Sequence, residues 1–473
     1  MIQRTRIVCT LGPASDSEEI LRAMIRAGVD VVRLNFSHGD HAGHAARIER
    51  VRRIAREENA NVAILADLQG PKIRVGEIAG GVAALLAGAS FTLTTRMVAG
   101  DANTVSIDFP DLPKSVHPGD RILLDDGLIE LRVVSASATD VVTNVVTGGD
   151  LSPHKGVNLP GVPLKISAVT EKDRADLAFA IEQDVDYIGL SFVRRAADVR
   201  ELIDLISKRG AAIPVIAKIE KPEAMGEIDA ILSASDGIMV ARGDLGVEAP
   251  PEQVPIFQKT LIHAANAVGK PVITATQMLE SMIHNPRPTR AEASDVANAI
   301  LDGTDAVMLS GETAMGKYPV EAVQMMAHIA QAVEGSLQFK TCAHDFGGGS
   351  MSVTDAIGNA TCEIARSLGA KLIITSTSSG FTARMISRHH PLVPIFAVTS
   401  NERTLRRLAL VWGVQAVLAK RAATMDEIIE DSLKAALQHG VAKPGDLAVI
   451  TAGVPVGAPG RTNMLQVRAL GEK

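Results

Sequence analysis

The runs VIAKIE (residues 215–220) and GIMVARGD (residues 237–244) decide the interpretation of the fold. Each contains a short, β-branched apolar strand, Val215–Ile219 or Gly237–Ala241, that is followed by charged residues and then by helix-forming sequence. A nearly continuous apolar strand is typical of a parallel sheet that is covered on both faces. The two runs therefore predict two consecutive strand–helix units of an α/β fold.

The same unit recurs along the chain and predicts a (β/α)8 TIM barrel. Six further strand-like runs are Ile7–Thr10, Val31–Phe36, Ala63–Leu68, Tyr187–Phe192, Val272–Thr276 and Ala306–Leu309. The helices predicted between them include Ser17–Ala27, His41–Arg56, Ala196–Lys208, Glu252–Val268 and Ala291–Leu301. A capping box from Thr289 to Glu292 precedes the last of these.

One long interval breaks this rhythm, because the run that follows Leu68 begins only at Tyr187. The sequence between them alternates as short strands do. The alternating stretches are Ser90–Thr95, Thr104–Ile107, Arg121–Leu124, Leu128–Val134 and Val141–Val146. We predict that residues 71–165 form a small β-barrel lid domain, because an excursion at the carboxyl end of a barrel strand is a usual place for an active-site lid.

A second boundary lies at the linker-like run Gly347–Ser350. Beyond it, strands and helices alternate again and predict a C-terminal α/β domain over residues 350–473, which leaves residues 1–70 and 166–340 for the barrel. The predicted elements are Thr354–Leu368, Leu372–Thr375, Thr382–His389, Ile395–Val398, Thr404–Trp412 and Leu447–Thr451.

Composition excludes several classes of protein. Hydrophobic residues make up 46% of the 473 residues, which argues against a disordered chain. A net charge of −6 and an aromatic content of 3% argue against nucleic-acid binding. Three scattered cysteines and the lack of a long apolar run predict a cytoplasmic protein without a membrane segment.

Polar residues stand at the carboxyl ends of the predicted strands, which open into one mouth of a barrel. The carboxylates Glu220 and Asp244 are ligands that Mg²⁺ or Mn²⁺ takes together with substrate oxygens. The cations Arg33, Lys218 and Arg74 suit a phosphoryl group, because its transfer needs matched charge. Other polar strand ends are Asn35, Ser37, His38, Asp67, Arg242, Gly243, Thr276, Gln277, Ser310 and Glu312.

A purely structural explanation of these residues is the alternative. Lys218 with Glu220, and Arg242 with Asp244, would then be ion pairs at the barrel rim. Because six of the eight predicted strands contribute polar ends, a catalytic mouth is favoured.

Six motifs resemble those of the pyruvate kinase family and are spread over the predicted barrel. The motifs are Thr10–Pro13, Arg33–His38, Lys218–Glu220, Met239–Gly246, Ala275–Met282 and Met308–Thr313. The resemblance implies phosphoryl transfer from phosphoenolpyruvate to ADP, giving pyruvate and ATP, the last step of glycolysis. Homotetramers are usual in that family.

The resemblance also implies roles for individual residues around the transferred group. Glu220 and Asp244 would hold Mg²⁺ or Mn²⁺, and Lys218, assisted by Arg33, would neutralise the phosphoryl group. The substrate carboxylate would bind the amides of Gly243 and Asp244 and the hydroxyl of Thr276. Thr276 and Ser310 lie where a proton relay to the enolate carbon is proposed in the family. On the nucleotide side and the lid, the matching positions are Asn35, His38, Arg74, Lys155 and Asp126, of which Asp126 would meet Arg33 on closure.

One departure from the family pattern concerns K⁺. Many members hold K⁺ at positions that match Asn35, Ser37, Asp67 and the carbonyl of Leu68, and they carry a glutamate where this chain has Lys72. A lysine ammonium is itself a monovalent cation. We therefore predict that catalysis does not require K⁺; the alternative is that Lys72 points to solvent.

The C-terminal domain resembles the family's regulatory domain. The hydroxyl-rich loop Ser376–Thr382 matches its phosphate-binding loop, with Thr377, Ser378, Ser379 and Thr382 as candidate effector contacts. The loop Gly453–Arg461 departs from the pattern of members that fructose 1,6-bisphosphate activates. We expect a monophosphate, AMP or a sugar phosphate, as the effector; a plain helix cap is the alternative.

Two other functions use similar residues. A Mg²⁺-dependent lyase acting on the pyruvate enolate would share the two carboxylates but needs neither a lid nor Lys155. A non-catalytic sensor of a phosphorylated metabolite would lack metal or cationic residues in the mouth, and none is missing here.

Overall fold

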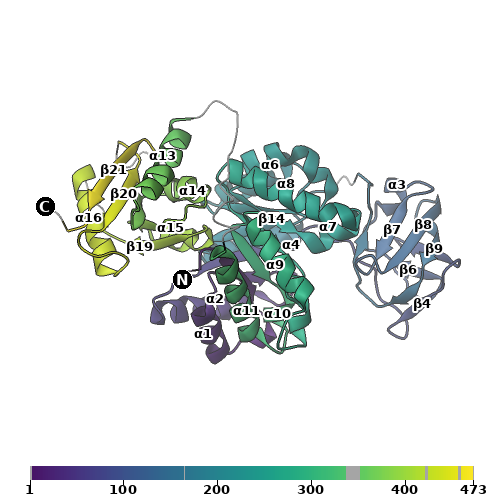
Figure 1. Ribbon diagram of the computed structural model, residues 1–473. Helices are drawn as coiled ribbons and strands as arrows, with labels where there is room; N and C mark the ends of the chain where they lie inside the picture. The colour runs from purple at the N-terminus through teal and green to yellow at the C-terminus, as the bar shows by residue number, and fades with distance from the viewer. Residues whose placement is uncertain (1–2, 164–165, 337–351, 421–423, 456–459, 472–473) are drawn as a thin grey trace.

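The computed structural model describes residues 3–163, 166–336, 352–420, 424–455 and 460–471. Figure 1 shows a central barrel with the β-rich lid at one end and the C-terminal α/β domain at the other. Within the described residues, no helix combines the length and the apolar character that crossing a bilayer requires.

The barrel is closed by parallel strands that lie in the order of the sequence. Val8 of the first strand pairs with Val31 of the second and also with Met308 of the last, which closes the ring. The strands are buried along almost their whole length, as the apolar runs predicted, and the predicted (β/α)8 barrel is confirmed. They are β1 (Arg6–Thr10), β2 (Val31–Asn35), β3 (Ala63–Asp67), β12 (Tyr187–Leu190), β13 (Val215–Ile219), β14 (Gly237–Ala241), β15 (Val272–Ala275) and β16 (Ala306–Leu309).

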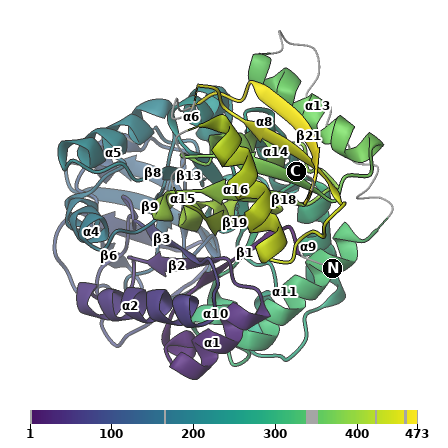
Figure 2. The ribbon, with the colours of Figure 1, turned by 90° about the vertical axis from the view of Figure 1, so that its left-hand side faces the viewer.

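Helices form the outer layer around these strands (Figure 2). The capping box of Thr289 and Glu292 is present, and Ser17 caps the first helix by accepting from the Ile20 amide. The main outer helices are α1 (Glu18–Ala27), α2 (His41–Glu57), α4 (Glu171–Glu182), α5 (Ala196–Lys208), α6 (Ile228–Ala234), α8 (Val254–Ala267), α9 (Arg290–Leu301) and α11 (Pro319–Glu334).

Short helical turns occupy several strand–helix connections. The predicted helix Glu252–Val268 is wrong at its start, because a separate 3-10 turn ends at Gln253. Pro255, which lacks an N–H, then occupies the first turn of α8. The turns are η1 (Pro13–Ser15), η2 (Pro222–Glu227), α7 (Arg242–Glu248), η3 (Pro251–Gln253), η4 (Glu280–Ile283) and α10 (Gly311–Ala314).

The lid is an all-β unit with its own apolar core, which includes Phe91, Leu93 and Leu131. Its strands form a six-stranded sheet and a two-stranded sheet around that core. Among the described residues, the predicted small barrel therefore consists of two sheets. The elements are β4 (Ala83–Leu85), β5 (Ser90–Thr94), β6 (Thr104–Ser106), α3 (Leu112–Ser115), β7 (Arg121–Leu124), β8 (Ile129–Ala136), β9 (Asp140–Thr147), β10 (Gly149–Leu151) and β11 (Val157–Asn158).

The C-terminal domain holds a sheet of order β19-β18-β17-β20-β21 with helices on its faces. The predicted helix Thr404–Trp412 is wrong in its second half, because the chain turns into a 3-10 segment whose Ala409 and Leu410 pack into the apolar interior of the barrel. The elements are α13 (Val353–Ser367), β17 (Leu372–Ser376), α14 (Phe381–Ser387), β18 (Ile395–Thr399), α15 (Glu402–Arg407), η5 (Leu408–Leu410), β19 (Val414–Leu418), α16 (Met425–Gln438), β20 (Leu447–Ala452) and β21 (Met464–Ala469).

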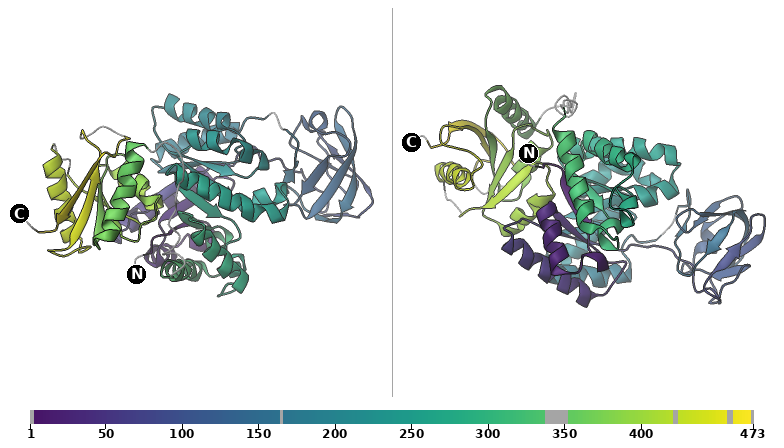
Figure 3. Two further views of the ribbon diagram at one scale, coloured as in Figure 1. Left: turned by 45° about the horizontal axis from the view of Figure 1, so that its top comes forward. Right: turned by 60° about the horizontal axis from the view of Figure 1, so that its bottom comes forward.

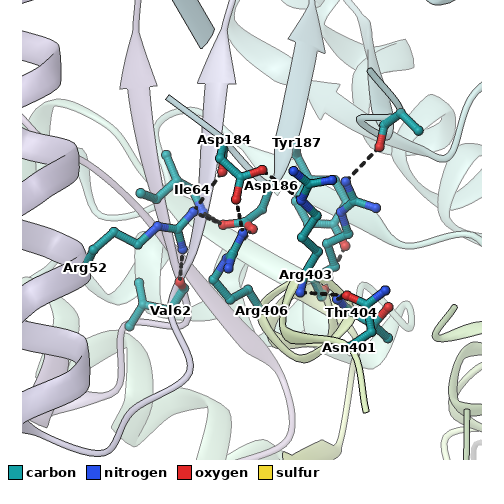
Figure 4. Close-up of polar contacts among 12 residues, drawn as sticks. Arg52, Val62, Ile64, Asp184, Asp186, Tyr187, Asn401, Arg403, Thr404 and Arg406 are labelled. Carbon is teal, nitrogen blue, oxygen red and sulfur yellow. Dashed lines mark hydrogen bonds and ion pairs between the residues drawn. The ribbon is translucent and has the colours of Figure 1, made fainter. Parts of the chain in front are cut away.

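Ion pairs fasten this domain to the amino end of the barrel (Figure 4). Buried Asp186 pairs with Arg52 of α2 at 2.8 Å and with Arg406 of α15 at 2.7 Å. The same carboxylate accepts from the Ile64 amide at 2.9 Å, at the start of β3. Asp184 pairs with Arg403 and Arg406, each at 2.8 Å. One end of the barrel is thus plugged, and only the carboxyl end faces the lid.

Candidate active site

The predicted site lies at the carboxyl ends of the barrel strands, on the side of the lid (Figure 3). Lys218 is at its centre. Its Nζ lies 2.9 Å from Glu220 Oε1, 3.2 Å from Asp67 Oδ1 and 2.7 Å from Ser191 Oγ. Burial by itself would lower the pKa of Lys218, but Asp67 and Glu220 outweigh burial and raise it. The mouth therefore holds a charged ammonium against its floor.

Arg33 joins this centre from β2. Its Nε donates to Asp67 Oδ2 at 2.6 Å, and its Nη1 donates to Thr10 Oγ1 at 3.0 Å. Burial would raise the pKa of Asp67, but Lys218 and Arg33 together hold it below its ordinary value. Asp67 is thus an ionised bridge that fixes two cations beside each other.

The predicted metal ligands differ in exposure. The Glu220 side chain is 2% exposed and accepts from the Phe192 amide at 2.7 Å, whereas that of Asp244 is 31% exposed. Burial, with a further contribution from Asp244, raises the pKa of Glu220. Among the described residues, no group of three or more His, Cys, Asp or Glu is placed to hold a metal ion. This pair fits a hard divalent cation that keeps water or substrate oxygens as its other ligands.

A strained loop follows β15. Thr276 has φ +76° and Gln277 has φ +55°, which is unusual for a β-branched residue such as threonine. Arg242 holds this backbone by donating to the carbonyls of Ala275 and Thr276, at 3.1 and 2.7 Å. Its ion-pair partner is Asp295, at 2.7 Å, so the alternative pairing of Arg242 with Asp244 is wrong. The other alternative pair, Lys218 with Glu220, is present.

Gly243 lies against this loop because it has no side chain. A Cβ at Gly243 would be 2.7 Å from Thr276 Cγ2, well inside van der Waals contact. Across the mouth, the Ser310 amide donates to Glu312 Oε2 at 2.7 Å, and Glu312 Oε1 accepts from the Leu279 amide at 3.1 Å. Buried Glu312 therefore ties the ends of two neighbouring strands together.

The predicted nucleotide-side residues come from β2 and the hinge of the lid. Asn35 Oδ1 accepts from the Ser37 amide at 3.1 Å, and the His38 amide donates to the Asn35 carbonyl at 3.2 Å. Arg74 donates to the His154 carbonyl at 3.0 Å, and Lys155 pairs with Asp125 at 2.8 Å. These contacts leave the Lys155 side chain 41% exposed.

Two predictions concern contacts made from the lid. Asp126 lies in the turn after β7. In this structure Arg33 donates to Asp67 and Thr10, so its predicted contact with Asp126 on lid closure stays a prediction. The Lys72 ammonium lies 3.7 Å from Asp244 Oδ1, next to a predicted Mg²⁺ ligand. At the positions that match the K⁺ site, the Leu68 carbonyl accepts from Ser191 at 2.7 Å, and Asp67 is shared by the two cations.

The candidate effector loop joins β17 to α14. Ser378 and Ser379 are exposed, whereas Thr377 and Thr382 are buried. The Ser378 carbonyl accepts from Thr404 Oγ1 at 2.8 Å, and the Thr382 hydroxyl bonds that of Thr462 at 3.0 Å. Part of the second loop, residues 456–459, lies outside the described residues.

Sequence reasoning missed two hydroxyls that touch the central cations. Ser191 follows β12 directly, so the strand-end rule that found the other residues would have found it had the strand been ended at Leu190. Thr10 ends β1 and bonds Arg33. Sequence reasoning also missed buried Glu248, which accepts a hydrogen bond from Asn158 of the lid.

Fold and site together define a barrel enzyme whose mouth is built for phosphoryl transfer. Residues 2–323 match the family model described as pyruvate kinase, barrel domain, and residues 355–468 match the model described as pyruvate kinase, alpha/beta domain. The chain therefore belongs to the pyruvate kinase family, whose members are phosphotransferases.

Individual pyruvate kinases are similar to this chain over nearly all of its length. The chain is 50% identical to the pyruvate kinase of Geobacillus stearothermophilus over 100% of its own length and 81% of the relative's. It is 47% identical to that of Clostridium acetobutylicum over 99% and 100% of the two chains. A crystal structure of a pyruvate kinase from Cryptosporidium parvum superposes with a TM-score of 0.93 at 38% identity, covering 99% and 96% of the two chains.

Proposed function

We propose that this chain transfers the phosphoryl group of phosphoenolpyruvate to ADP with the help of Mg²⁺ or Mn²⁺, giving pyruvate and ATP in the last step of glycolysis. The observation that carries the proposal is the buried Lys218 ammonium, 2.9 Å from Glu220 and 3.2 Å from Asp67. An immobile cation that is already desolvated stabilises charge developing on a transferred phosphoryl group without reorganising. Arg33, held by Asp67, adds a second cation.

Glu220 and Asp244 are the residues that would hold the divalent ion. When bound, such an ion neutralises phosphoryl and carboxylate oxygens and orients them. The raised pKa of Glu220 supports this assignment, because a nearby cation would offset the carboxylate charge that burial disfavours.

The loop after β15 would position the substrate. The amides of Gly243 and Asp244, at the start of α7, and the hydroxyl of Thr276 would bind the substrate carboxylate. The absence of a side chain at Gly243 lets α7 and the Thr276 loop lie close together. The phosphoryl group then leaves the enol oxygen for the terminal phosphate oxygen of ADP. The remaining enolate takes a proton at carbon from a water relayed by Thr276 and Ser310, whose hydroxyls have pKa values too high to act as acids alone.

The lid, residues 71–165, would supply the nucleotide contacts. Lys155 and Arg74 approach the phosphates of ADP from the hinge, and Asn35 and His38 approach from β2. Exposure of the Lys155 side chain supports this role, because a phosphate can reach it. Closure of the lid would bring Asp126 to Arg33 and exclude water from the mouth.

K⁺ would not be required, because the Lys72 ammonium supplies a permanent positive charge beside the mouth. The test compares ATP formation in buffer free of K⁺ with ATP formation at 100 mM K⁺, in the wild type and in Lys72→Glu. We expect near-equal rates in the wild type and at least about tenfold activation by K⁺ in the variant. A wild type active only with K⁺ would contradict the role of Lys72.

The C-terminal domain would bind a phosphorylated effector, AMP or a sugar monophosphate. The exposed hydroxyls of Ser378 and Ser379 support this site, with Thr377 and Thr382 shaping the loop from inside. We expect a cytoplasmic homotetramer, and loss of effector activation without loss of basal activity in Ser378→Ala/Ser379→Ala.

The first experiment measures ATP from phosphoenolpyruvate, ADP and Mg²⁺. ATP formation supports the kinase. Carbon–carbon cleavage of a pyruvate adduct without ATP formation would favour the lyase, and binding of a phosphorylated metabolite without turnover would favour the sensor.

A further inference from the structure

The lid contacts one short helix of the barrel at three places. Lys72, in the outgoing hinge segment, lies 3.7 Å from Asp244 at the start of α7. Asn158, on the returning strand β11, donates to Glu248 at the end of α7, at 2.8 Å. Between them, a Cβ at Gly127 would lie 3.6 Å from Val247, so the turn after β7 also lies against this helix. The lid is therefore attached to α7, the helix that carries the candidate metal ligand Asp244.

Glu248 is the buried member of this contact. Its side chain is 1% exposed, and its carboxylate pairs with the Lys221 ammonium as well as accepting from Asn158. Lys221 is the residue after Glu220, the other candidate metal ligand. One carboxylate thus joins the lid to both segments that would hold the divalent ion. Burying a carboxylate is costly unless its partners are fixed, so the three groups hold one arrangement.

The two hinge segments are hydrogen-bonded to each other. The Val157 amide donates to the Ile73 carbonyl at 2.9 Å, and the Val75 amide donates to the Lys155 carbonyl at 3.0 Å. A small cavity beside these segments is lined among others by Lys72, Asn158 and Lys221. Lys155 lies three residues before Asn158 in the same hinge segment, so the contact of Asn158 with Glu248 is close to the candidate nucleotide contact.

We propose that Glu248 is a positioning residue for phosphoryl transfer. Its carboxylate pins the returning hinge strand through Asn158 and holds Lys221 and α7 in place, so that the nucleotide contact on the lid and the divalent-ion site are aligned by one side chain. This inference rests on the proposed function and adds to it a group that touches neither substrate nor metal.

The test separates the two arms of Glu248. Asn158→Ala removes only the lid arm and leaves the Glu248–Lys221 ion pair in place. We expect kcat/KM for ADP to fall about tenfold in this variant, as loss of a hydrogen bond to a charged group does. The KM for phosphoenolpyruvate and the Mn²⁺ dissociation constant, measured by electron paramagnetic resonance of free Mn²⁺, should stay within twofold.

Glu248→Leu removes both arms, because leucine offers no acceptor to Asn158 or to Lys221. In this variant we expect the same fall in kcat/KM for ADP. We also expect Mn²⁺ binding to weaken about fivefold, because the unpaired Lys221 ammonium then lies next to Glu220. The double variant should resemble Glu248→Leu in kcat/KM for ADP, since both changes break the contact between Asn158 and Glu248. Glu130→Gln, which removes a carboxylate paired with Arg121 and Arg132 inside the lid, is the matched control and should match the wild type.

Unchanged ADP kinetics in Asn158→Ala, within twofold of an active wild type, would overturn the proposal, even if the melting temperature falls. If Glu248→Leu does not fold, Asn158→Ala alone decides. A wild type without ATP formation would instead contradict the proposed function, so the two failures are distinguishable.

Discussion

The two ends of the barrel use the same buried chemistry for different purposes. At the carboxyl end, Asp67 lies between Arg33 and Lys218; at the amino end, Asp186 lies between Arg52 and Arg406. Both carboxylates are almost fully buried. A buried aspartate between two cations is therefore not by itself a mark of function.

The neighbours of each cluster make the difference. At the amino end, Arg406 comes from the C-terminal domain, so the charges lie in the interface between that domain and the barrel. The segment η5 packs beside them into the apolar interior of the barrel. At the carboxyl end, every partner belongs to the barrel, and the half-exposed Asp244 and the lid face the charges instead of a packed domain. The charges that an interface would cover remain available for a substrate.

The largest effect should come from breaking the carboxyl-end cluster. Lys218→Met removes the cation that we propose to lie beside the phosphoryl group, and we expect kcat to fall at least about 10³-fold. ATP formation in a coupled assay measures it. Lys259→Met on the surface of α8, where the lysine pairs with Asp302, is the control and should leave kcat unchanged. A loss of less than tenfold would mean that the carboxyl-end cluster has only a structural role, as the amino-end cluster has.

Breaking the amino-end cluster should cost stability rather than chemistry. Asp186→Ala leaves Arg52 and Arg406 without their shared carboxylate and the Ile64 amide without an acceptor. We expect unfolding free energy to fall by about 3–5 kcal/mol, with kcat of the folded enzyme within about threefold of wild type. Urea unfolding followed by circular dichroism measures it. Asp184→Ala is the matched control: this carboxylate is 48% exposed, and the change should cost about 1 kcal/mol or less. Equal costs for both would contradict the assigned roles.

The smallest effect concerns another carboxylate at the amino end. Burial raises the pKa of Asp305 from 3.8 to about 7, although its Oδ2 accepts from the Val272 amide at 2.9 Å. The folded state then binds a proton that the unfolded state has lost between these pKa values, so this group's contribution to stability falls as pH rises from about 4 to 7.

Asp305→Asn should remove that dependence. We expect the unfolding free energy of the variant, relative to wild type, to rise by about 2 kcal/mol between pH 5 and 7. Urea unfolding across this range measures the difference. Arg6 and His390, which face Asp305, stay unchanged in the comparison. A constant difference between the two proteins would mean that Asp305 is ionised throughout.

Much of the barrel could be predicted because burial on both faces leaves a plain apolar run. Val215–Ile219, Gly237–Ala241 and Ala306–Leu309 have the bounds that the sequence indicated. Strand β11 was missed, because two residues carry no periodic pattern. The end of the helix at Arg407 was missed because tertiary packing into the barrel, not local preference, turns the chain there.

The candidate site could be predicted where residues follow a strand directly. Lys218, Glu220 and Asp67 were found in this way, and the structure brings them together. Side-chain pairing was not predictable in the same way, because Arg242 reaches Asp295 rather than its sequence neighbour Asp244. Nor does any local pattern join Asn158 to Glu248, since that contact depends on where the lid comes to rest.

Insertion of the lid also has a consequence for the order of folding. Leu65 of β3 must find Tyr187 of β12 across the whole insert before the barrel can close, and contacts of such separation slow folding. The lid has its own core, and its two hinge strands bridge each other at Arg74 and Gly156. Once the lid has folded, its ends lie side by side, and the barrel needs to close only a short loop. The lid would thus also help the barrel to close, because it brings the end of β3 near the segment that leads to β12.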